Sequence, residues 1–270
     1  GNNFPDALAG TYLATQKNIP ILLTHVNNNT IMGQVRDYIL ENVKAGGKVY
    51  ILGGEKAVES KIADGLEAYN VVRLEGSNRY KTNIEVLKET GLKAGSKILV
   101  CTGLSYADNL SASATGLPIL MVPGTAKLQA YHKEYLQTLG TNNEFIIIGG
   151  TNAVNDTIAK ELEAYGTVDR VYGKNRYVTA VEIAKMFFGT PKAAVIVTGT
   201  EFADGLCGGL LAYNLKAPLL LTYPKREGDA ANYIKSMGIE DGYILGGEKA
   251  VPNDSGLGIF NTDKIIDTTK

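Results

Sequence analysis

Arginine recurs at fixed positions of this chain, and it is the residue type with the most evident chemistry. The pattern Gly-x-Asn-Arg-Tyr-x-Thr occurs at 76–82 and again at 173–179, each time three residues after another arginine. A guanidinium offers a planar fork of N–H donors that fits the oxygens of carboxylates and phosphates. We therefore take these residues as candidate ligands for an anion; they are Arg73, Arg79, Arg170 and Arg176. The alternative is that they form internal ion pairs with recurring aspartates such as Asp108 and Asp204.

An aspartate recurs two residues after an aromatic residue, in the triplets Phe4-Pro5-Asp6, Tyr106-Ala107-Asp108 and Phe202-Ala203-Asp204. A carboxylate there can cap the helix that follows, because it accepts orphan N–H groups and favours the positive end of the helix dipole. A catalytic role would need a partner acid, histidine or serine, and none recurs beside it. We predict helix caps or ion-pair partners, and no catalytic residue.

A double glycine follows an apolar run three times, at Gly53-Gly54, Gly149-Gly150 and Gly246-Gly247. Such a strand–glycine–helix junction can present backbone N–H groups to a phosphate. Glycine also permits the positive φ of a tight turn. The chain has neither G-x-G-x-x-G nor G-x-x-x-x-G-K-[ST], so the nucleotide signal is weak. We predict tight-turn glycines.

Histidine and cysteine are scarce and do not follow the repeat. His25 and His132 fall at different points of their copies, so no metal site or Ser-His-Asp set can be built symmetrically. Cys101 and Cys207 occupy non-equivalent sites that hold small or apolar residues in other copies, which predicts buried core thiols. We expect no metal and no cofactor.

The elements that carry these residues form a tandem repeat. ILGGEKAV stands at 51–58 and 244–251, with IIGGTNAV at 147–154, and the first glycines are 96 and 97 residues apart. The middle copy alternates apolar, β-rich runs with helical patterns four times. This alternation predicts a parallel sheet with right-handed crossovers and helices on both faces.

Three modules follow from the repeat, at residues 1–72, 73–169 and 170–270. The first copy begins at the aromatic-x-Asp motif, so it lacks the strand and helix that carry the Arg-Tyr motif in the others. We expect the missing piece to lie upstream of Gly1.

The amino-acid composition argues against nucleic-acid binding and against insertion into a membrane. Hydrophobic residues make up 44% and charged residues 20%, which suits a folded, soluble protein. The formal net charge is −1, so no global field draws in nucleic acid. No apolar run approaches the roughly 20 residues that span a bilayer, and we predict no membrane insertion.

Taken together, these strings resemble the cell wall binding repeat type 2 family, found as triplets in Gram-positive surface proteins. The resemblance rests on VRLEGSNRYKT and DRVYGKNRYVT, on FPDALAG, YADNLSA and FADGLCG, and on the three glycine strings. It implies an α/β fold of three tandem Rossmann-like modules, each a small parallel sheet with helices on both faces, arranged with pseudo-threefold symmetry.

The resemblance also implies a function: non-covalent anchoring to the wall through an anionic, phosphate-bearing polysaccharide, by a secreted protein at the cell surface. This region is then not an enzyme, and a catalytic or adhesive domain is carried elsewhere in the polypeptide. The four arginines are our polymer-binding candidates from the residues alone. Two alternatives stay open: a structural module that contacts other surface-layer proteins, and a nucleotide-binding α/β enzyme.

Overall fold

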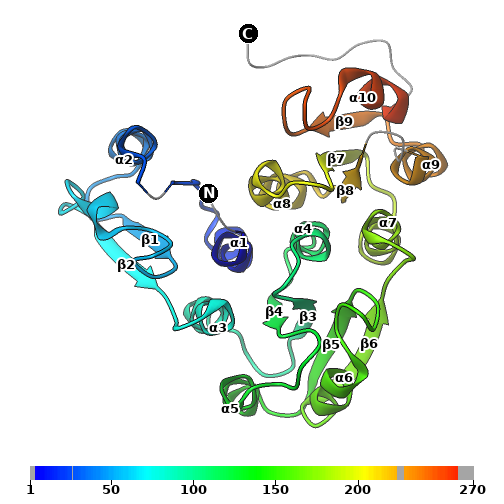
Figure 1. Cartoon of the computed structure of the whole chain (residues 1–270), viewed down its shortest axis with the longest axis horizontal. Helices are drawn as coiled ribbons and strands as arrows, with labels where there is room; N and C mark the ends of the chain where they lie inside the picture. The colour runs from blue at the N-terminus through cyan, green and yellow to red at the C-terminus, as the bar shows by residue number, and fades with distance from the viewer. Residues whose placement is uncertain (1–3, 26, 224–227, 261–270) are drawn as a thin grey trace.

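The computed structural model describes residues 4–25, 27–223 and 228–260, and within them the chain forms three parallel sheets flanked by helices (Figure 1). The α/β class expected from the sequence is therefore confirmed. The first sheet pairs β1 (Lys48–Leu52) with β2 (Asn70–Leu74). The second has the order β4-β3-β5-β6, with bounds Ile119–Val122, Lys97–Thr102, Asn143–Ile148 and Gly166–Val171. The third has the order β8-β7-β9, with bounds Leu219–Thr222, Ala193–Thr198 and Asp241–Ile244.

Helices lie between the strands in the order that the repeat predicts. The first six are α1 (Pro5–Lys17), α2 (Asn29–Asn42), α3 (Arg79–Glu89), α4 (Ala107–Ser113), α5 (Ala130–Thr138) and α6 (Asp156–Leu162). The last four are α7 (Arg176–Phe187), α8 (Ala203–Leu215), α9 (Gly228–Met237) and α10 (Asn253–Phe260), and a short 3-10 helix covers Ser60–Ala63. Of the helices in the described part of the chain, none is long and apolar enough to cross a membrane.

The chain passes from one repeat to the next after β2 and after β6. These strands pair in parallel with β1 and β5, with Ile51 opposite Arg73 and Ile147 opposite Arg170. Helix α3 then crosses to the second sheet, where Asn83 donates to the Ile119 carbonyl (2.9 Å) and accepts from the Met121 amide (2.9 Å). The module boundaries expected at 72/73 and 169/170 thus fall within β2 and β6, and the division into modules stays a prediction.

The three repeats meet at α1, α4 and α8, which lie at the centre of the molecule (Figure 1). The aromatic residues at the starts of these helices are equivalent in the repeat: Phe4, Tyr106 and Phe202. Their ring centroids are 5.6, 5.7 and 5.7 Å apart, so the three rings form a nearly equilateral trio. This geometry supports the pseudo-threefold arrangement.

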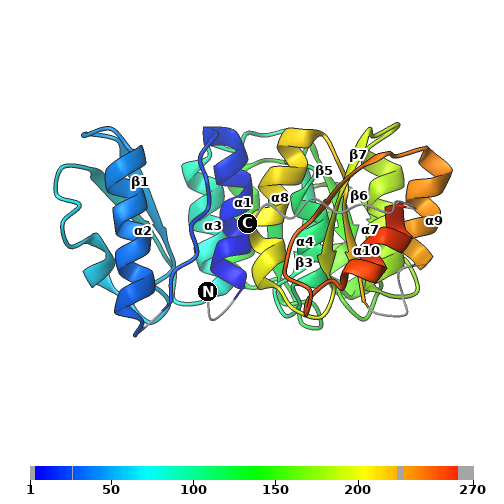
Figure 2. The same cartoon turned by 90° about the horizontal axis from the view of Figure 1, so that it is seen from above.

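Small residues allow the central helices to approach one another. A β-carbon at Gly205 of α8 would lie 2.8 Å from Leu110 Cδ1 of α4. A β-carbon at Gly209 would overlap the Ser113 side chain and lie 3.3 Å from Thr11 of α1. Helices α1, α3 and α8 run along the same direction across the thickness of the molecule (Figure 2). The small-residue composition of the central helices therefore serves packing between repeats.

The two cysteines lie in different environments. Cys101 is buried in β3, as expected, but Cys207 is exposed on α8, so its prediction as a core thiol is wrong. Its equivalents Ala9 and Ser111 are both buried, on helices α1 and α4, which pack against α3 and α7. The position of Cys207 in α8 is therefore exposed, although the equivalent positions in α1 and α4 are buried.

Candidate binding site at the junctions between repeats

The Gly-x-Asn-Arg-Tyr-x-Thr motif builds the start of the helix that crosses between repeats. Asn78 is the N-cap of α3, and its Oδ1 accepts from the amides of Tyr80 and Lys81, both at 3.0 Å. Asn175 caps α7 in the same way. The sequence reasoning missed this role, although asparagine is among the preferred N-cap residues.

The threonine of the motif closes the turn that precedes each helix. The amide of Gly76 donates to Thr82 Oγ1 at 3.1 Å, and the amide of Gly173 donates to Thr179 Oγ1 at 3.0 Å. A β-carbon at Gly76 would lie 2.7 Å from the Thr82 amide nitrogen, so only glycine leaves room for this close approach. The glycine, asparagine and threonine of the motif thus have structural roles.

The arginine of the motif reaches across to the end of the next central strand. Arg79 Nη1 donates to the Gly103 carbonyl at 2.6 Å, and Arg176 Nη1 donates to the Gly199 carbonyl at 2.7 Å. Each guanidinium also lies over an aromatic ring of the preceding repeat, with Arg176 Cζ 5.5 Å from the Tyr106 ring centroid. These arginines therefore join two repeats, which leaves their part in ligand binding as a prediction.

The other two arginines hold the double-glycine turns. Arg73 Nη1 donates to the carbonyls of Gly53 (2.7 Å) and Val58 (2.9 Å). Arg170 Nη1 makes the equivalent bonds to Gly149 and Val154, both at 2.9 Å, and its Nη2 lies 3.3 Å from Asp156. Both guanidinium groups thus bind backbone at the end of a strand. A role in binding polymer is untested for them too.

The three recurring aspartates lie in the first turn of α1, α4 and α8, at the second helical residue. The N-cap position itself belongs to the aromatic residue, which makes no side-chain cap bond. Burial raises the pKa of Asp6, against the lowering effects of Thr82 and Arg79. Burial also raises the pKa of Asp108, and Arg176 opposes the shift. Two aspartates thus face the arginine of the following repeat.

The first glycine of each pair has the backbone of a tight turn, with φ of +98° at Gly53, +103° at Gly149 and +110° at Gly246. The second glycines are Gly54, Gly150 and Gly247, and none has a positive φ. In the turn after β5, the amides of Ala153 and Val154 donate to the Gly150 carbonyl. The amides of Gly150, Thr151 and Asn152 donate no hydrogen bond within the described part of the chain. Consecutive amides without partners can form a concavity suited to an anion.

A cavity of about 550 Å³ opens over this turn. It lies at the carboxyl ends of β3, β5 and β6 and at the starts of α4 and α7, with a wall from residues 172–176. Strand order changes between β3 and β5, and open α/β sheets bind ligands at such a switch point. The charged residues that line the cavity are Asp108, Lys174 and Arg176. The lining therefore carries a net positive charge of one.

The described residues contain no cluster of three or more His, Cys, Asp or Glu side chains that could hold a metal ion. The cavity's lining suits a polar, charged small group: backbone amides, one lysine, one arginine and one carboxylate. It combines these with the exposed ring of Tyr172, whose exposed fraction is 58%.

Comparison with protein families gives one match, to cell wall binding domain 2, over residues 1–63, 73–159 and 170–255. Three matched segments agree with the tandem repeat, and the match confirms the predicted resemblance.

Two curated relatives come from Bacillus subtilis (strain 168). The N-acetylmuramoyl-L-alanine amidase LytC is 28% identical over 258 residues, which is 93% of this chain and 50% of the relative. The amidase enhancer is 29% identical over 224 residues, which is 80% of this chain and 29% of the relative. The chain thus spans at most about half the length of these relatives.

Two solved structures from Clostridium difficile share the fold. Cwp8 superposes with a TM-score of 0.79 at 26% identity, over 96% of this chain and 46% of the other. Cwp6 superposes with a TM-score of 0.74 at 22% identity, over 90% of this chain and 40% of the other. At this identity the likeness shows the fold alone.

Proposed function

Because the chain belongs to the cell wall binding domain 2 family, we propose that it anchors a surface protein to the Gram-positive wall without a covalent bond. The ligand in this proposal is an anionic, phosphate-bearing wall polysaccharide, and the repeated modules are the binding units. The relatives' names describe an amidase and an amidase enhancer, and this chain matches only part of each. We place catalysis outside the residues 1–270 and the protein itself outside the cell, on the wall.

The observation that carries the proposal is the cavity over the Gly149–Gly150 turn. It joins unpaired backbone amides to a lining with a net positive charge, and both features favour an anion. A nucleotide-binding enzyme is less well supported, because the turn lacks the glycine fingerprints of nucleotide sites.

The four arginines enter the proposal with different weights. Arg176 lines the cavity and retains donors beyond the Nη1 that binds Gly199, so it can contact a ligand. Arg79 occupies the equivalent place at the first junction. Arg170 acts on the ligand through the turn that it holds, and Arg73 holds the equivalent turn at the first junction. Several weak sites on one polymer chain would add up to firm retention, since each further contact occurs at a high effective concentration.

Retention on purified Gram-positive walls tests the proposal. The chain is sedimented with intact walls and with walls from which mild acid has removed the phosphate-linked polymers, at low and at high salt. We expect retention on intact walls, loss on stripped walls and weakening by salt, because salt screens exposed charges. Equal retention on stripped walls would overturn the polymer as ligand. Self-association without wall retention would favour the surface-layer alternative.

A further inference from the structure

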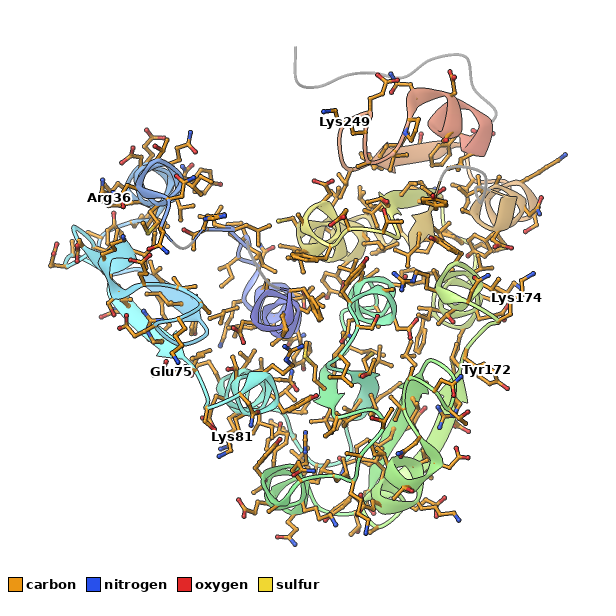
Figure 3. The ribbon with its side chains drawn as sticks, in the orientation of Figure 1. Arg36, Glu75, Lys81, Tyr172, Lys174 and Lys249 are labelled. Atoms are coloured by element: carbon orange, nitrogen blue, oxygen red, sulfur yellow. The ribbon has the colours of Figure 1, made fainter. Side chains whose placement is uncertain are left out.

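The two junctions between repeats are built alike but differ in charge at two equivalent positions, and this difference bears on which of them binds the polymer. At the first junction, Glu75 and Ser77 follow β2. At the second, Tyr172 and Lys174 occupy the equivalent positions after β6. Figure 3 shows Glu75 between β2 and α3, and Tyr172 and Lys174 on the segment between β6 and α7. The place where the ligand binds follows from this difference, provided that the proposed function holds.

At the first junction a carboxylate lies beside the double-glycine turn. Glu75 Oε2 would be 2.8 Å from a β-carbon at Gly54, the second glycine of the turn. The amides of Gly54, Glu55 and Lys56 donate no hydrogen bond within the described part of the chain, as is the case for the equivalent amides at the second junction. Glu75 therefore puts a negative charge where an anion would have to approach these amides. The Glu75 carboxylate would repel a phosphate there, because both groups are negatively charged and close together.

At the second junction an aromatic ring takes the place of that carboxylate. Tyr172 Cδ2 would be 3.6 Å from a β-carbon at Gly150, an ordinary contact distance. Tyr172 is 58% exposed, so its side chain is accessible to a ligand. Lys174 is exposed two residues further on and lines the same cavity. An aromatic surface, a lysine and free amides are thus within one cavity of about 550 Å³.

From this contrast we propose that the second junction is a binding site for a sugar phosphate unit of the polymer and that the first junction is not. The phosphate binds the amides of Gly150, Thr151 and Asn152 together with Lys174. The apolar face of the sugar ring packs on Tyr172, as apolar groups pack on exposed aromatic side chains. Asp108 accepts hydrogen bonds from sugar hydroxyls, and Arg176 keeps that carboxylate from repelling the phosphate. The cavity is large enough for one such unit.

Amide NMR shifts of the ¹⁵N-labelled chain test the site directly. The probes are α-D-glucose 1-phosphate, glucose and inorganic phosphate, each titrated separately. We expect glucose 1-phosphate to shift the amides of residues 150–152 and 172–176, while the amides of residues 54–56 stay unchanged. Phosphate alone should bind the same amides about tenfold more weakly, because it lacks the contact with Tyr172. Equal shifts at both turns, or none at residues 150–152, would overturn the site.

Substitutions then separate the two contacts. Tyr172→Ala and Lys174→Ala should each weaken glucose 1-phosphate binding about tenfold, a loss of about 1.4 kcal/mol. Lys160→Ala removes the same charge from an exposed position on α6 and should leave binding unchanged. If Lys160→Ala weakens binding as much as Lys174→Ala, the effect is one of total charge and the site is wrong.

A residue exchange provides the strongest test, because it predicts a gain. Glu75→Tyr with Ser77→Lys should create phosphate-dependent shifts at residues 54–56, and Tyr172→Glu with Lys174→Ser should abolish those at residues 150–152. Wall retention of the unaltered chain is measured in parallel. Retention that is not weakened by the second exchange would overturn this site but not the anchor, whereas no retention of the unaltered chain would overturn the proposed function itself.

Discussion

The carboxylate of Asp108 lies against Gly149 so closely that its Oδ2 would be 2.6 Å from a β-carbon on that glycine. The same relationship joins Asp6 to Gly53 and Asp204 to Gly246, at 2.5 Å in each case. Two motifs that look independent in the sequence are thus one structural unit. The first turn of the central helix supplies the carboxylate, and the end of the strand supplies the glycine that makes room for it.

Replacement of that glycine should be costly. In Gly149→Ala the new β-carbon would overlap Asp108 Oδ2, and its φ of +103° is one that L-residues rarely adopt. We expect a loss of about 2–4 kcal/mol in the free energy of unfolding, from backbone strain together with displacement of the carboxylate. Urea denaturation at neutral pH measures it.

The adjacent glycine is the matched control. Gly150 has no positive φ, and a β-carbon there would meet only Tyr172 at 3.6 Å. Gly150→Ala should change the free energy of unfolding by less than about 1 kcal/mol. Equal losses in the two variants would contradict the role assigned to the contact between Asp108 and Gly149.

Much of this architecture could be read from the sequence because the repeat is so regular. Apolar runs of four to six residues between helical patterns identified strands buried on both faces, such as β3 and β7. The equal spacing of the glycine strings identified three copies. What the pattern did not reveal is partnership in space: Asp108 and Gly149 are far apart in the chain, and only the fold brings them together.

The arginines show a second limit of the sequence. A recurring arginine is equally consistent with a ligand contact and with an internal one, since a guanidinium donates to any well-placed oxygen. In the structure, Arg79 and Arg176 bind backbone carbonyls at strand ends. The asparagine beside each of them could have been recognised as an N-cap, because it directly precedes a helical pattern. Tyr172 could not be recognised as a candidate from the repeat, because the equivalent position in the preceding copy holds Glu75 and the tyrosine does not recur.

The aromatic trio at the centre should couple the three repeats. Phe202→Ala removes a ring that lies 5.7 Å from both Phe4 and Tyr106, measured between ring centroids. Since the ring is half-buried, we expect a loss of about 2 kcal/mol in the free energy of unfolding, below the range for a fully buried phenylalanine. Calorimetry should also show a broader transition, as repeats that interact less unfold less cooperatively. Phe202→Tyr, which copies the residue of the second repeat, should be nearly neutral; a similar loss there would argue against the trio.

His132 should make the fold sensitive to mild acid. The residue is fully buried; Nδ1 accepts from the Gln129 amide (3.2 Å), and Nε2 lies 3.0 Å from the Met121 carbonyl. Burial lowers its pKa from 6.5 to about 4, although the bond to Met121 opposes the shift. The unfolded chain therefore takes up a proton at a higher pH than the folded one. Stability due to the neutral ring is fully present above pH 6.5 and is lost as the pH falls towards 4, by up to about 3 kcal/mol.

Urea denaturation between pH 7 and pH 4 measures this loss, and His132→Gln provides the comparison. Glutamine has a donor and an acceptor but does not titrate, so the variant should lose less stability over this range than the unaltered chain. Identical pH profiles would show that other groups cause the acid sensitivity.

Arg176 should contribute to stability through its bonds and through Asp108. Arg176→Ala removes a charged donor to the Gly199 carbonyl, worth about 1.5–3 kcal/mol. It also removes the positive charge that lowers the pKa of Asp108, so that pKa should rise further above its ordinary value. A carboxyl with a raised pKa destabilises the fold only where it is ionised. The loss in Arg176→Ala should therefore be larger at neutral pH and smaller in acid.

Two comparisons isolate this effect. Asp108→Asn added to Arg176→Ala should recover part of the stability at neutral pH, because the buried charge without its partner is gone. Arg36→Ala, on α2, removes a 3.9 Å contact between partly exposed charges of Arg36 and Asp37 and should be close to neutral. No recovery in the double variant would mean that Arg176 acts through Gly199 alone.

Because Arg176→Ala is expected to unfold more readily, its wall retention is measured at a temperature where both the variant and the unaltered chain are fully folded. A loss of retention under those conditions would assign Arg176 a part in binding in addition to its part in the fold.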